Sequence, residues 1–390
     1  MSNIDRYLTW MVESDGSDLY VIVGRPATLK VSGQHLLSPD GKLDAKDIQE
    51  MVQDVCNEAQ AAEFAVTQEM NLGYGIPNVG RFRVNVYKQR GTPAMVIRYV
   101  KSVIPTMEEL NLPHNLAELA LEKRGLLLLT GAAGTGKSTT LASMIDYRNQ
   151  HVEGHIVTVE DPIEFLHEHK KSIVTQREVG IDTDSFHSAL RNILRQAPDV
   201  VLIGEMRDTE TVSAAINFAE TGHLVLATLH SNTADQALER ILSFFPLDSQ
   251  HQIFQQLSLE LKGIVSLRLL PRGDGAGVIP AFEILLNTPR IQELIERGEV
   301  PELKSAMAAS RAEGNLTFDQ CLYDLTKRGY ISEEEALRWA DSRNNLSLKF
   351  KMEKTKGEQA EAETDRGRPR RGPESGRPID HTGLRLSRNR

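Results

Sequence analysis

The sequence predicts an α/β protein whose larger part is a mostly parallel sheet covered by helices. Apolar runs alternate with segments of helical periodicity between about residues 106 and 250, which is typical of βαβ units. The apolar run 126–130 leads into the glycine-rich segment 131–138 and then into a helical segment. A strand, a loop and a helix therefore follow one another, and functional loops are expected at the carboxyl ends of the strands.

The first part of the chain, residues 1–105, is predicted to be a small α/β domain. A helix is expected from Asp44 to Phe64, because apolar residues recur there at helical spacing. A proline-punctuated stretch at 104–113 marks the linker that follows. Strands are expected between glycine and proline turns, at 19–23, 28–31, 81–87 and 94–100.

The second part, residues 106–350, is predicted to be the larger domain. From Gln250 to about Asn345 the pattern is largely helical. Ser332 with Glu335 fits a capping box, so a helix is expected to begin there. The strands of this domain are expected at the apolar runs 126–130, 156–159, 200–203 and 224–227.

The last part, residues 351–390, is predicted to be a disordered tail, because it has almost no large apolar residues. It holds 11 basic and 7 acidic side chains, which leaves 34 basic and 47 acidic side chains in residues 1–350. Such an acidic body repels a nucleic-acid backbone, so no nucleic-acid partner is expected. The arginine-rich segment 366–371 either contacts an acidic partner or is solvated without a fixed role.

Composition also bounds the compartment. Apolar residues make up 40% of the 390 residues, but no stretch is long and apolar enough to span a membrane. The amino terminus lacks the layout of a signal peptide. Cys56 and Cys321 are too few for a zinc cluster or a disulfide framework, so a cytoplasmic protein with reduced thiols is expected.

The glycine-rich segment matches the phosphate-loop pattern G-x-x-x-x-G-K-[ST] at every fixed position. Glycines let backbone N–H groups converge on a phosphate, and the start of the next helix adds positive partial charge. Lys137 is expected to neutralise the β- and γ-phosphates of ATP, and the Ser138 hydroxyl to bind Mg²⁺. The predicted nucleotide-binding residues are Gly131, Ala132, Ala133, Gly134, Thr135, Gly136, Lys137, Ser138 and Thr139.

Carboxylates follow two more of the predicted strands. Glu160, Asp161 and Glu164 surround a proline turn, where one of them can orient or deprotonate an attacking water. The alternative is that they cap the next helix. Glu205 follows the run 200–203 in the manner of a Walker B acid, although that acid is Asp in most P-loop NTPases.

Two histidines bracket the strand predicted at 224–227. His223 and His230 are seven residues apart, so on a regular strand they face opposite sides and do not share one metal ion. The alternative for each histidine is that it only makes a local hydrogen bond and has no catalytic role.

Three arginines of the first domain, Arg81, Arg83 and Arg98, are further candidates. Arginines on surface strands are usually solvated. A multisubunit ATPase, however, often completes its site with an arginine delivered across an interface.

Together these segments resemble the bacterial secretion and type IV pilus ATPases, and within them the PilT/PilU retraction ATPases. The resemblance runs from about Leu8 to Asn345. Residues 175–179 and 195–199 also resemble family segments. The main motifs are the Walker A loop at 131–138, the Asp box at 160–164, the Glu-containing Walker B at 204–208 and the His box at 221–230.

The resemblance implies a PAS-like N-terminal domain and a RecA-like C-terminal ATPase domain, with nucleotide bound between them. It assigns the catalytic role to Glu164 and a place beside Mg²⁺ to Glu205. It also implies that six copies form a ring.

The same resemblance gives roles to the histidines and to two of the arginines. His223 and His230 are expected to link the nucleotide state to subunit geometry. Arg83 and Arg98 are expected to reach the nucleotide phosphates.

The function implied is a hexameric, Mg-ATP-hydrolysing motor for pilus retraction and twitching motility. Its expected place is the cytoplasmic side of the inner membrane at the pilus base, where it acts on a membrane platform protein. Two cysteines in place of a four-cysteine element, and no long extra N-terminal region, favour the retraction branch over the extension ATPases.

Within the retraction branch, residues 17–20, 196–199 and 244–246 resemble PilU more than PilT. Asn287–Leu294 stands where PilT-type chains carry an Ala-Ile-Arg-Asn-Leu segment. The resemblance therefore implies an accessory motor that acts with a PilT-type ATPase. Two alternatives are a translocase for nucleic acid or a secretion substrate, and a structural ring subunit that binds nucleotide.

Overall fold

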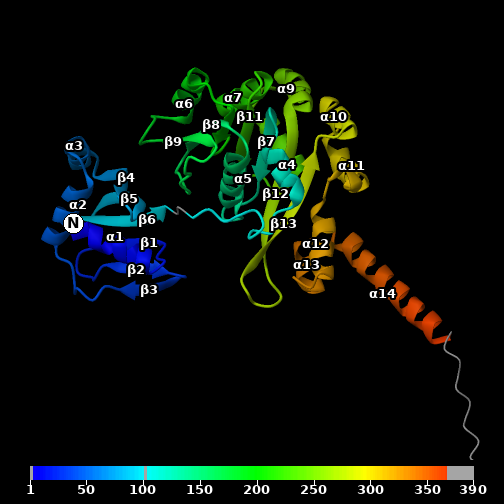
Figure 1. The fold of residues 1–390 in the computed structure, drawn as a ribbon, viewed down its shortest axis with the longest axis horizontal. Helices are drawn as coiled ribbons and strands as arrows, with labels where there is room; N and C mark the ends of the chain where they lie inside the picture. Colours follow the sequence, from blue (N-terminus) through cyan, green and yellow to red (C-terminus); the bar gives the residue numbers. More distant parts are fainter. Residues whose placement is uncertain (1–2, 101–102, 367–390) are drawn as a thin grey trace, which may run out of the picture. The chain divides into compact units, whose positions relative to one another are not determined.

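Two β-sheets, built from different parts of the chain, carry the fold of this protein (Figure 1). The computed structural model describes residues 3–100 and 103–366, apart from the side chains of 354 and 356–366. Residues 1–336 form one compact unit, and a second unit begins at Leu337. The predicted α/β class is confirmed, and the domain boundary after residue 105 stays a prediction.

The N-terminal sheet is antiparallel, with strand order β3-β2-β1-β6-β5-β4. Buried apolar residues of the sheet, such as Leu19 and Ile97, share a core with Leu8 and Ile48 of the helices. Its strands are β1 (Asp18–Val21), β2 (Thr28–Val31), β3 (Gln34–Leu37), β4 (Glu69–Ile76), β5 (Gly80–Gln89) and β6 (Thr92–Val100). Its helices are α1 (Asn3–Glu13), α2 (Ala45–Val55) and α3 (Glu58–Thr67).

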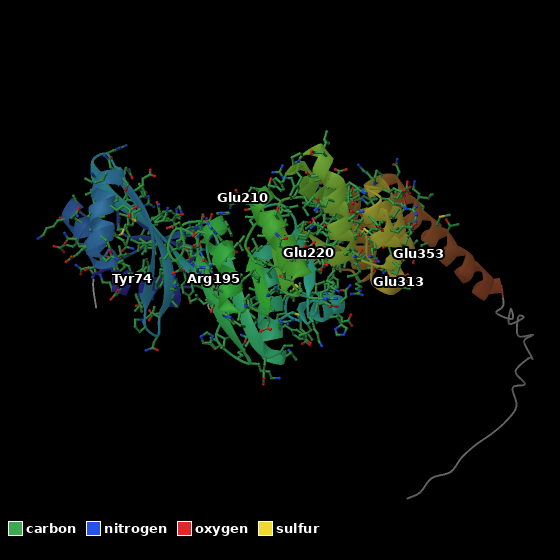
Figure 2. All side chains as sticks on the ribbon, turned by 90° about the horizontal axis from the view of Figure 1, so that it is seen from above. Tyr74, Arg195, Glu210, Glu220, Glu313 and Glu353 are labelled. Atoms are coloured by element: carbon green, nitrogen blue, oxygen red, sulfur yellow. The ribbon has the colours of Figure 1, made fainter. Side chains whose placement is uncertain are left out.

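A polar contact also ties the outer strand β4 to α1. The hydroxyl of Tyr74, a residue labelled in Figure 2, donates to Asp5 Oδ1 at 2.8 Å. The helix that carries Ile4 and Leu8 into the core is therefore bound to the sheet by a hydrogen bond as well as by apolar packing.

The single helix predicted over Asp44–Phe64 is two helices, α2 and α3. Asn57 starts the second one, because its side chain accepts the Gln60 N–H at 2.9 Å while Gln60 Oε1 accepts the Asn57 N–H at 3.0 Å. This reciprocal capping box satisfies backbone donors that a new helix leaves free. It interrupts the apolar periodicity that had suggested one continuous helix.

The larger sheet has seven strands in the order β13-β12-β7-β11-β10-β8-β9. Neighbouring strands are parallel except for the antiparallel pair β12 and β13. The four strands predicted from apolar runs are confirmed as β7, β8, β10 and β11. The bounds are β7 (Gly125–Thr130), β8 (Gly154–Glu160), β9 (Ser172–Glu178), β10 (Val200–Ile203), β11 (Leu224–Leu229), β12 (Leu261–Pro271) and β13 (Val278–Leu286).

Helices cover both faces of this sheet (Figure 1). Along β7, Leu126 and Leu128 pack into the core with α6 to α9, whereas Leu127 and Leu129 pack into the core with α4 and α5. Because successive side chains point to opposite faces of the sheet, β7 is buried on both sides. Burial of each leucine stabilises the fold by about 1.5–3 kcal/mol. The helices are α4 (His114–Ala120), α5 (Lys137–His151), α6 (Phe186–Ile193), α7 (Thr209–Glu220), α8 (Ala234–Ser243) and α9 (Leu247–Glu260).

The largely helical pattern predicted from Gln250 to Asn345 is wrong over the hairpin β12–β13, which is made of two strands. A buried strand shows a continuous apolar run, which periodicity alone does not distinguish from a buried helix. The turn between the strands contains Gly275 and Gly277, both with positive φ, which was the missed signal.

Beyond the hairpin the chain is helical as expected. Ser332 Oγ accepts the Glu335 N–H at 3.1 Å, and a helix starts at Glu333 as predicted. The remaining elements are α10 (Pro289–Glu296), α11 (Leu303–Ala309), α12 (Phe318–Lys327), α13 (Glu333–Trp339), α14 (Arg343–Arg366) and the 3₁₀ turns Leu194–Gln196, Val300–Glu302 and Arg311–Glu313.

Helix α14 extends through residues 351–366, where the sequence had predicted a disordered tail. Lys, Glu, Gln and Ala dominate this stretch, and these residues have high helix propensity even without an apolar face. Residues 367–390 of the predicted tail lie outside the described residues. Over the described ranges, no helix combines the length and apolar character needed to cross a membrane.

Candidate active site

The glycine-rich loop connects β7 to α5, in the strand–loop–helix order that the motif requires. Gly134 and Gly136 have φ angles of 78° and 90°, a left-handed conformation that glycine adopts without a steric penalty. Lys137 is the first residue of α5, and Gly136 is its N-cap. The free N–H groups of the first helical turn therefore form an anion-binding end at the loop.

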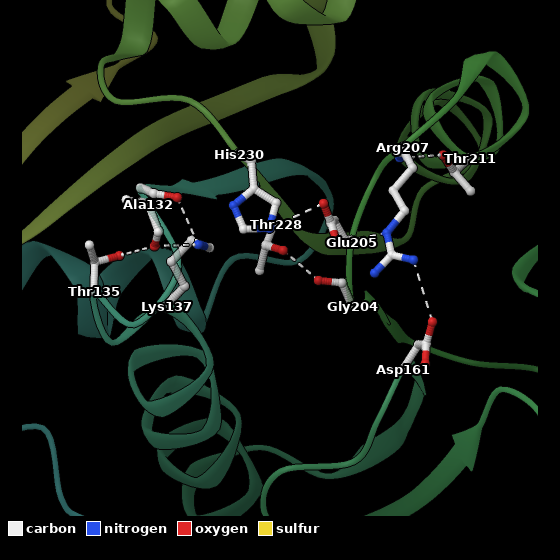
Figure 3. Close-up of polar contacts among 11 residues, drawn as sticks. Ala132, Thr135, Lys137, Asp161, Gly204, Glu205, Arg207, Thr211, Thr228 and His230 are labelled. Carbon is white, nitrogen blue, oxygen red and sulfur yellow. Dashed lines mark hydrogen bonds and ion pairs between the residues drawn. The ribbon is translucent and has the colours of Figure 1, made fainter. Parts of the chain in front are cut away.

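Lys137 is folded back onto the loop. Its Nζ donates to the carbonyl oxygens of Gly131 at 2.7 Å and Ala132 at 2.9 Å (Figure 3). The residue is only 8% exposed. Burial lowers the pKa of Lys137, while the carboxylates of Glu205 and Glu164 oppose this shift. A bound phosphate would compete with the two carbonyls for the ammonium group.

Replacing Gly131 with alanine is expected to distort this loop. Gly131 has a φ of 151°, and a Cβ there would lie 2.5 Å from Thr135 Oγ1 and 2.8 Å from the Leu267 carbonyl oxygen. Such strain costs about 1–3 kcal/mol, so Tm and ADP affinity are both expected to fall. Gly75→Ala in β4 is the matched control, because nothing lies within 4 Å of the added Cβ. Unchanged ADP affinity of Gly131→Ala in calorimetry would contradict the expected distortion.

Part of the predicted set meets in one pocket of about 280 Å³ at the carboxyl edge of the parallel strands. The loops after β7, β8, β10 and β11 converge there, because these strands lie side by side and run in the same direction. Five residues predicted to act on the nucleotide all line it: Lys137, Ser138, Glu164, Glu205 and His230.

A chain of polar contacts joins three of these loops (Figure 3). Arg207 Nε donates to Glu205 Oε2 at 2.8 Å, and Arg207 Nη1 lies 3.4 Å from Asp161 Oδ2. On its other side, Glu205 Oε1 lies 3.3 Å from His230 Nε2. Hydrogen bonding to Glu205 raises the pKa of Arg207. Glu205 therefore contacts His230 of the His box directly and Asp161 of the Asp box through Arg207.

Sequence reasoning had given Arg207 and Asp161 no separate role. Both lie inside recognised motif segments, but they are 46 residues apart and only the fold brings them together. Thr228 was also missed, although its Oγ1 donates to the Gly204 carbonyl oxygen and ties β11 to the Walker B turn. Its position two residues before His230 was the available signal.

Glu160 differs from the other carboxylates of the Asp box. Its Oε1 accepts hydrogen bonds from Thr158 Oγ1 at 2.7 Å and from Gln176 Nε2 at 3.2 Å. Desolvation by burial nevertheless raises the pKa of Glu160 to about 7. The sequence had grouped it with Asp161 and Glu164, because burial is not visible in the motif.

Replacing Glu160 with glutamine is expected to change how stability depends on pH. The folded pKa of about 7 exceeds the ordinary value of 4.5, so the folded state holds the proton more tightly. Stability is therefore lost as the pH rises from about 4.5 through about 7. With allowance for the exposed part of the side chain, the loss is about 1–3 kcal/mol.

We expect Glu160→Gln to have a higher Tm than wild type at pH 8 and a similar Tm near pH 4.5. Glu168→Gln, an exposed glutamate of the same loop, is the control. The same Tm difference at both pH values would show that Glu160 does not titrate in this window.

The donor set of the pocket suits Mg²⁺. Acidic groups exceed cationic ones, so a triphosphate would be repelled without an added cation. Ser138 and Glu205 are the residues that would hold the ion, which in NTPase sites keeps several waters and takes few protein ligands. Among the residues that the structure describes, no group of three or more His, Cys, Asp or Glu side chains could hold a metal ion. The charged residues that line the pocket are Lys137, Glu160, Asp161, Glu164, Glu205 and Arg207.

The structure does not bring His223 to this pocket. It lies at the start of β11, whereas the pocket is at the strand's other end. Its Nδ1 is 3.0 Å from the Phe218 carbonyl oxygen and 3.1 Å from Thr221 Oγ1. These contacts fix the turn before β11, and the predicted role of His223 in subunit geometry stays a prediction.

Arg83 and Arg98 lie directly opposite each other on β5 and β6 of the N-terminal sheet. Arg98 Nε donates to Asp18 Oδ1 at 2.9 Å, which holds that side chain on the sheet surface. The predicted contact of these two arginines with phosphates stays a prediction.

Fold and site together define a P-loop ATPase with a RecA-like parallel sheet. The sequence profile of the type II/IV secretion system protein family matches residues 3–314, and the chain belongs to this family. The resemblance proposed from the motifs is thereby confirmed.

Individual relatives agree with this assignment. The chain is 51% identical over 348 residues to the type IV pilus ATPase PilU of Pseudomonas aeruginosa, covering 89% of this chain and 91% of that protein. It is 39% identical over 334 residues to the type IV pilus retraction ATPase PilT of the same organism, covering 86% and 97%. The crystal structure of the pilus retraction motor PilT with bound ADP superposes with a TM-score of 0.83 at 41% identity, covering 89% and 99%.

Proposed function

We propose that this chain is an ATP-hydrolysing subunit of the motor that retracts type IV pili, and that it acts as a PilU-type accessory to a PilT-type ATPase. The observation that carries the proposal is the pocket itself. A complete phosphate loop, a glutamate on the Asp-box loop and a Walker B glutamate face one another at the edge of the sheet. Similarity to PilU over nearly the whole of both chains supports the specific assignment.

In the proposed mechanism the phosphates of ATP bind along Gly131–Thr139, with Lys137 neutralising their charge. Glu164 orients the attacking water and accepts its proton. Arg83 and Arg98 stabilise the charge that develops on the transferring phosphoryl group. Ser138 and Glu205 would hold Mg²⁺, which would supply electrostatic stabilisation of the same charge when bound.

We propose that the energy of ATP hydrolysis is converted to movement through the segment that connects the two domains. Loss of the products would let the two domains rotate about a hinge near residues 101–115, of which 101–102 lie outside the described residues. His230, whose Nε2 lies 3.3 Å from Oε1 of the Walker B glutamate, would report the state of the nucleotide. With His223 at the far end of the same strand, it would transmit that state to a neighbouring subunit in a ring of six.

The proposed location is the cytoplasmic face of the inner membrane at the base of the pilus, against a membrane platform protein.

The test is ATP turnover of the purified chain, alone and with a PilT-type ATPase, followed by pilus retraction in a deletion strain that carries the wild-type gene or none. We expect ATP turnover in at least one of the two assays. We also expect pilus retraction to depend on the presence of the gene. ATP hydrolysis stimulated by DNA and lost with rising salt would instead indicate a nucleic-acid translocase. Ring assembly with ADP and no turnover under any condition would indicate a structural subunit.

A further inference from the structure

The segment that carries Glu164 has little regular structure of its own. It connects β8 to β9, and Glu164 is an exposed residue between the buried side chains of Ile163 and Phe165. A group that orients a water for attack must be held closely, because a misplacement of about 1 Å costs as much as 100-fold in rate. Something outside the segment must therefore fix its backbone.

Gln176 of β9 contacts this backbone beyond Glu164 through both atoms of its amide. Its Nε2 donates to the Phe165 carbonyl oxygen at 2.9 Å, and its Oε1 accepts the His167 N–H at 2.8 Å. The same Nε2 lies 3.2 Å from Glu160 Oε1, at the end of β8. One amide group thus joins the start of the loop to the backbone that follows Glu164.

Glu178 contacts the backbone before Glu164. Its Oε2 accepts the Ile163 N–H at 3.3 Å, and its side chain is buried. Gln176 and Glu178 are two residues apart on one strand, so their side chains project to the same face. Both lie directly opposite residues of β8, in the register Thr158 to Gln176 and Glu160 to Glu178. The edge strand β9 therefore supports the loop from a rigid part of the sheet.

We propose that Gln176 and Glu178 are positioning residues that hold Glu164 at the phosphate pocket by binding the backbone on both sides of it. The inference rests on the proposed role of Glu164 in ATP hydrolysis. Neither side chain needs to contact the nucleotide for this role. β9 thereby becomes a functional strand and not only the edge of the sheet.

The first test replaces Gln176 with methionine, which has a similar length but makes no such hydrogen bonds. We expect kcat for ATP hydrolysis to fall by roughly 10–100-fold, because Glu164 is displaced. The KM for ATP and the affinity for ADP are expected to stay close to wild type, because the phosphate loop is untouched. Ile173→Ala, at an exposed position of β9, is the matched control and is expected to keep wild-type kcat.

A double-mutant cycle shows whether Gln176 acts through Glu164. In a Glu164→Gln background, Gln176→Met is expected to change the residual rate of phosphate release very little. An equal fold-loss in both backgrounds, or an unchanged kcat of Gln176→Met, would overturn the inference. Glu178→Gln keeps an acceptor for the Ile163 N–H and is expected to retain more activity than Glu178→Leu.

Hydrogen exchange of the full chain tests whether Gln176 holds the loop, independently of whether Glu164 acts in ATP hydrolysis. In Gln176→Met the His167 amide is expected to exchange faster, while the amides of β8 keep their protection. Unchanged exchange at His167 would overturn the positioning role even if Gln176→Met is inactive or poorly folded. Full turnover by Glu164→Gln alone would overturn the proposed role of Glu164, whereas faster exchange at His167 would still show that Gln176 holds the loop.

Discussion

Lys137→Ala is expected to lower ATP turnover by about 10²–10³-fold, the cost of removing one preorganised charge from a phosphoryl-transfer site. The ammonium is buried and already bound to two carbonyls of the loop, so little reorganisation is needed when a phosphate replaces them. Without it, the charge of the β- and γ-phosphates faces the carboxylates of the pocket unscreened. Steady-state phosphate release by the purified chain measures the effect.

The control for this change is Lys46→Ala, which removes the same charge from an exposed position of α2. Its turnover is expected to match wild type, because a surface ion pair contributes little. Strains that produce each variant extend the test to the pilus. If Lys137→Ala retracted pili at the wild-type speed, ATP hydrolysis by this chain would not be the source of the force.

The phosphate loop could be predicted from the sequence because all of its parts are contiguous. Strand β7, the glycines and the start of α5 occupy a single stretch, and each has a local signal in apolar run, glycine spacing or helical pattern. The same holds for the strands β8, β10 and β11. Each is buried on both faces and reads as an apolar run.

Features that depend on distant partners could not be predicted in the same way. The contact between Arg207 and Asp161 joins two loops that meet only because β8 and β10 are neighbours in the sheet. The raised pKa of Glu160 depends on desolvation, which no motif encodes. Gln176 stood in a recognised segment, but its partners lie on the loop before β9 and gave it no visible function.

Predictions of single elements failed where a local rule was outweighed by another. Apolar spacing suggested one helix over Asp44–Phe64, yet the capping pair Asn57 and Gln60 starts a second helix. For His223 and His230, strand periodicity addressed only which side each faces. In the structure, His223 precedes β11 and His230 follows it. The two histidines are therefore separated by the length of the strand, whichever side each faces.

Glu164→Gln is expected to lower phosphate release by about 10²–10⁴-fold, the usual contribution of a positioned general base. An amide accepts no proton from the attacking water, while its size and its backbone contacts are preserved. Nucleotide binding is expected to stay intact or to tighten, because one negative charge is removed beside the triphosphate. Phosphate release and calorimetric titration with ADP distinguish these two effects.

Glu168→Gln is the matched control, since it makes the same chemical change at an exposed position of the same loop. It is expected to hydrolyse ATP at the wild-type rate. Wild-type turnover by Glu164→Gln would transfer the role of base to another carboxylate of the Asp box. Glu160 is a poorer substitute, because its Oε1 already accepts hydrogen bonds from both Thr158 and Gln176. Asp161 would then be the candidate, and its pairing with Arg207 means that Arg207→Ala should change its reactivity.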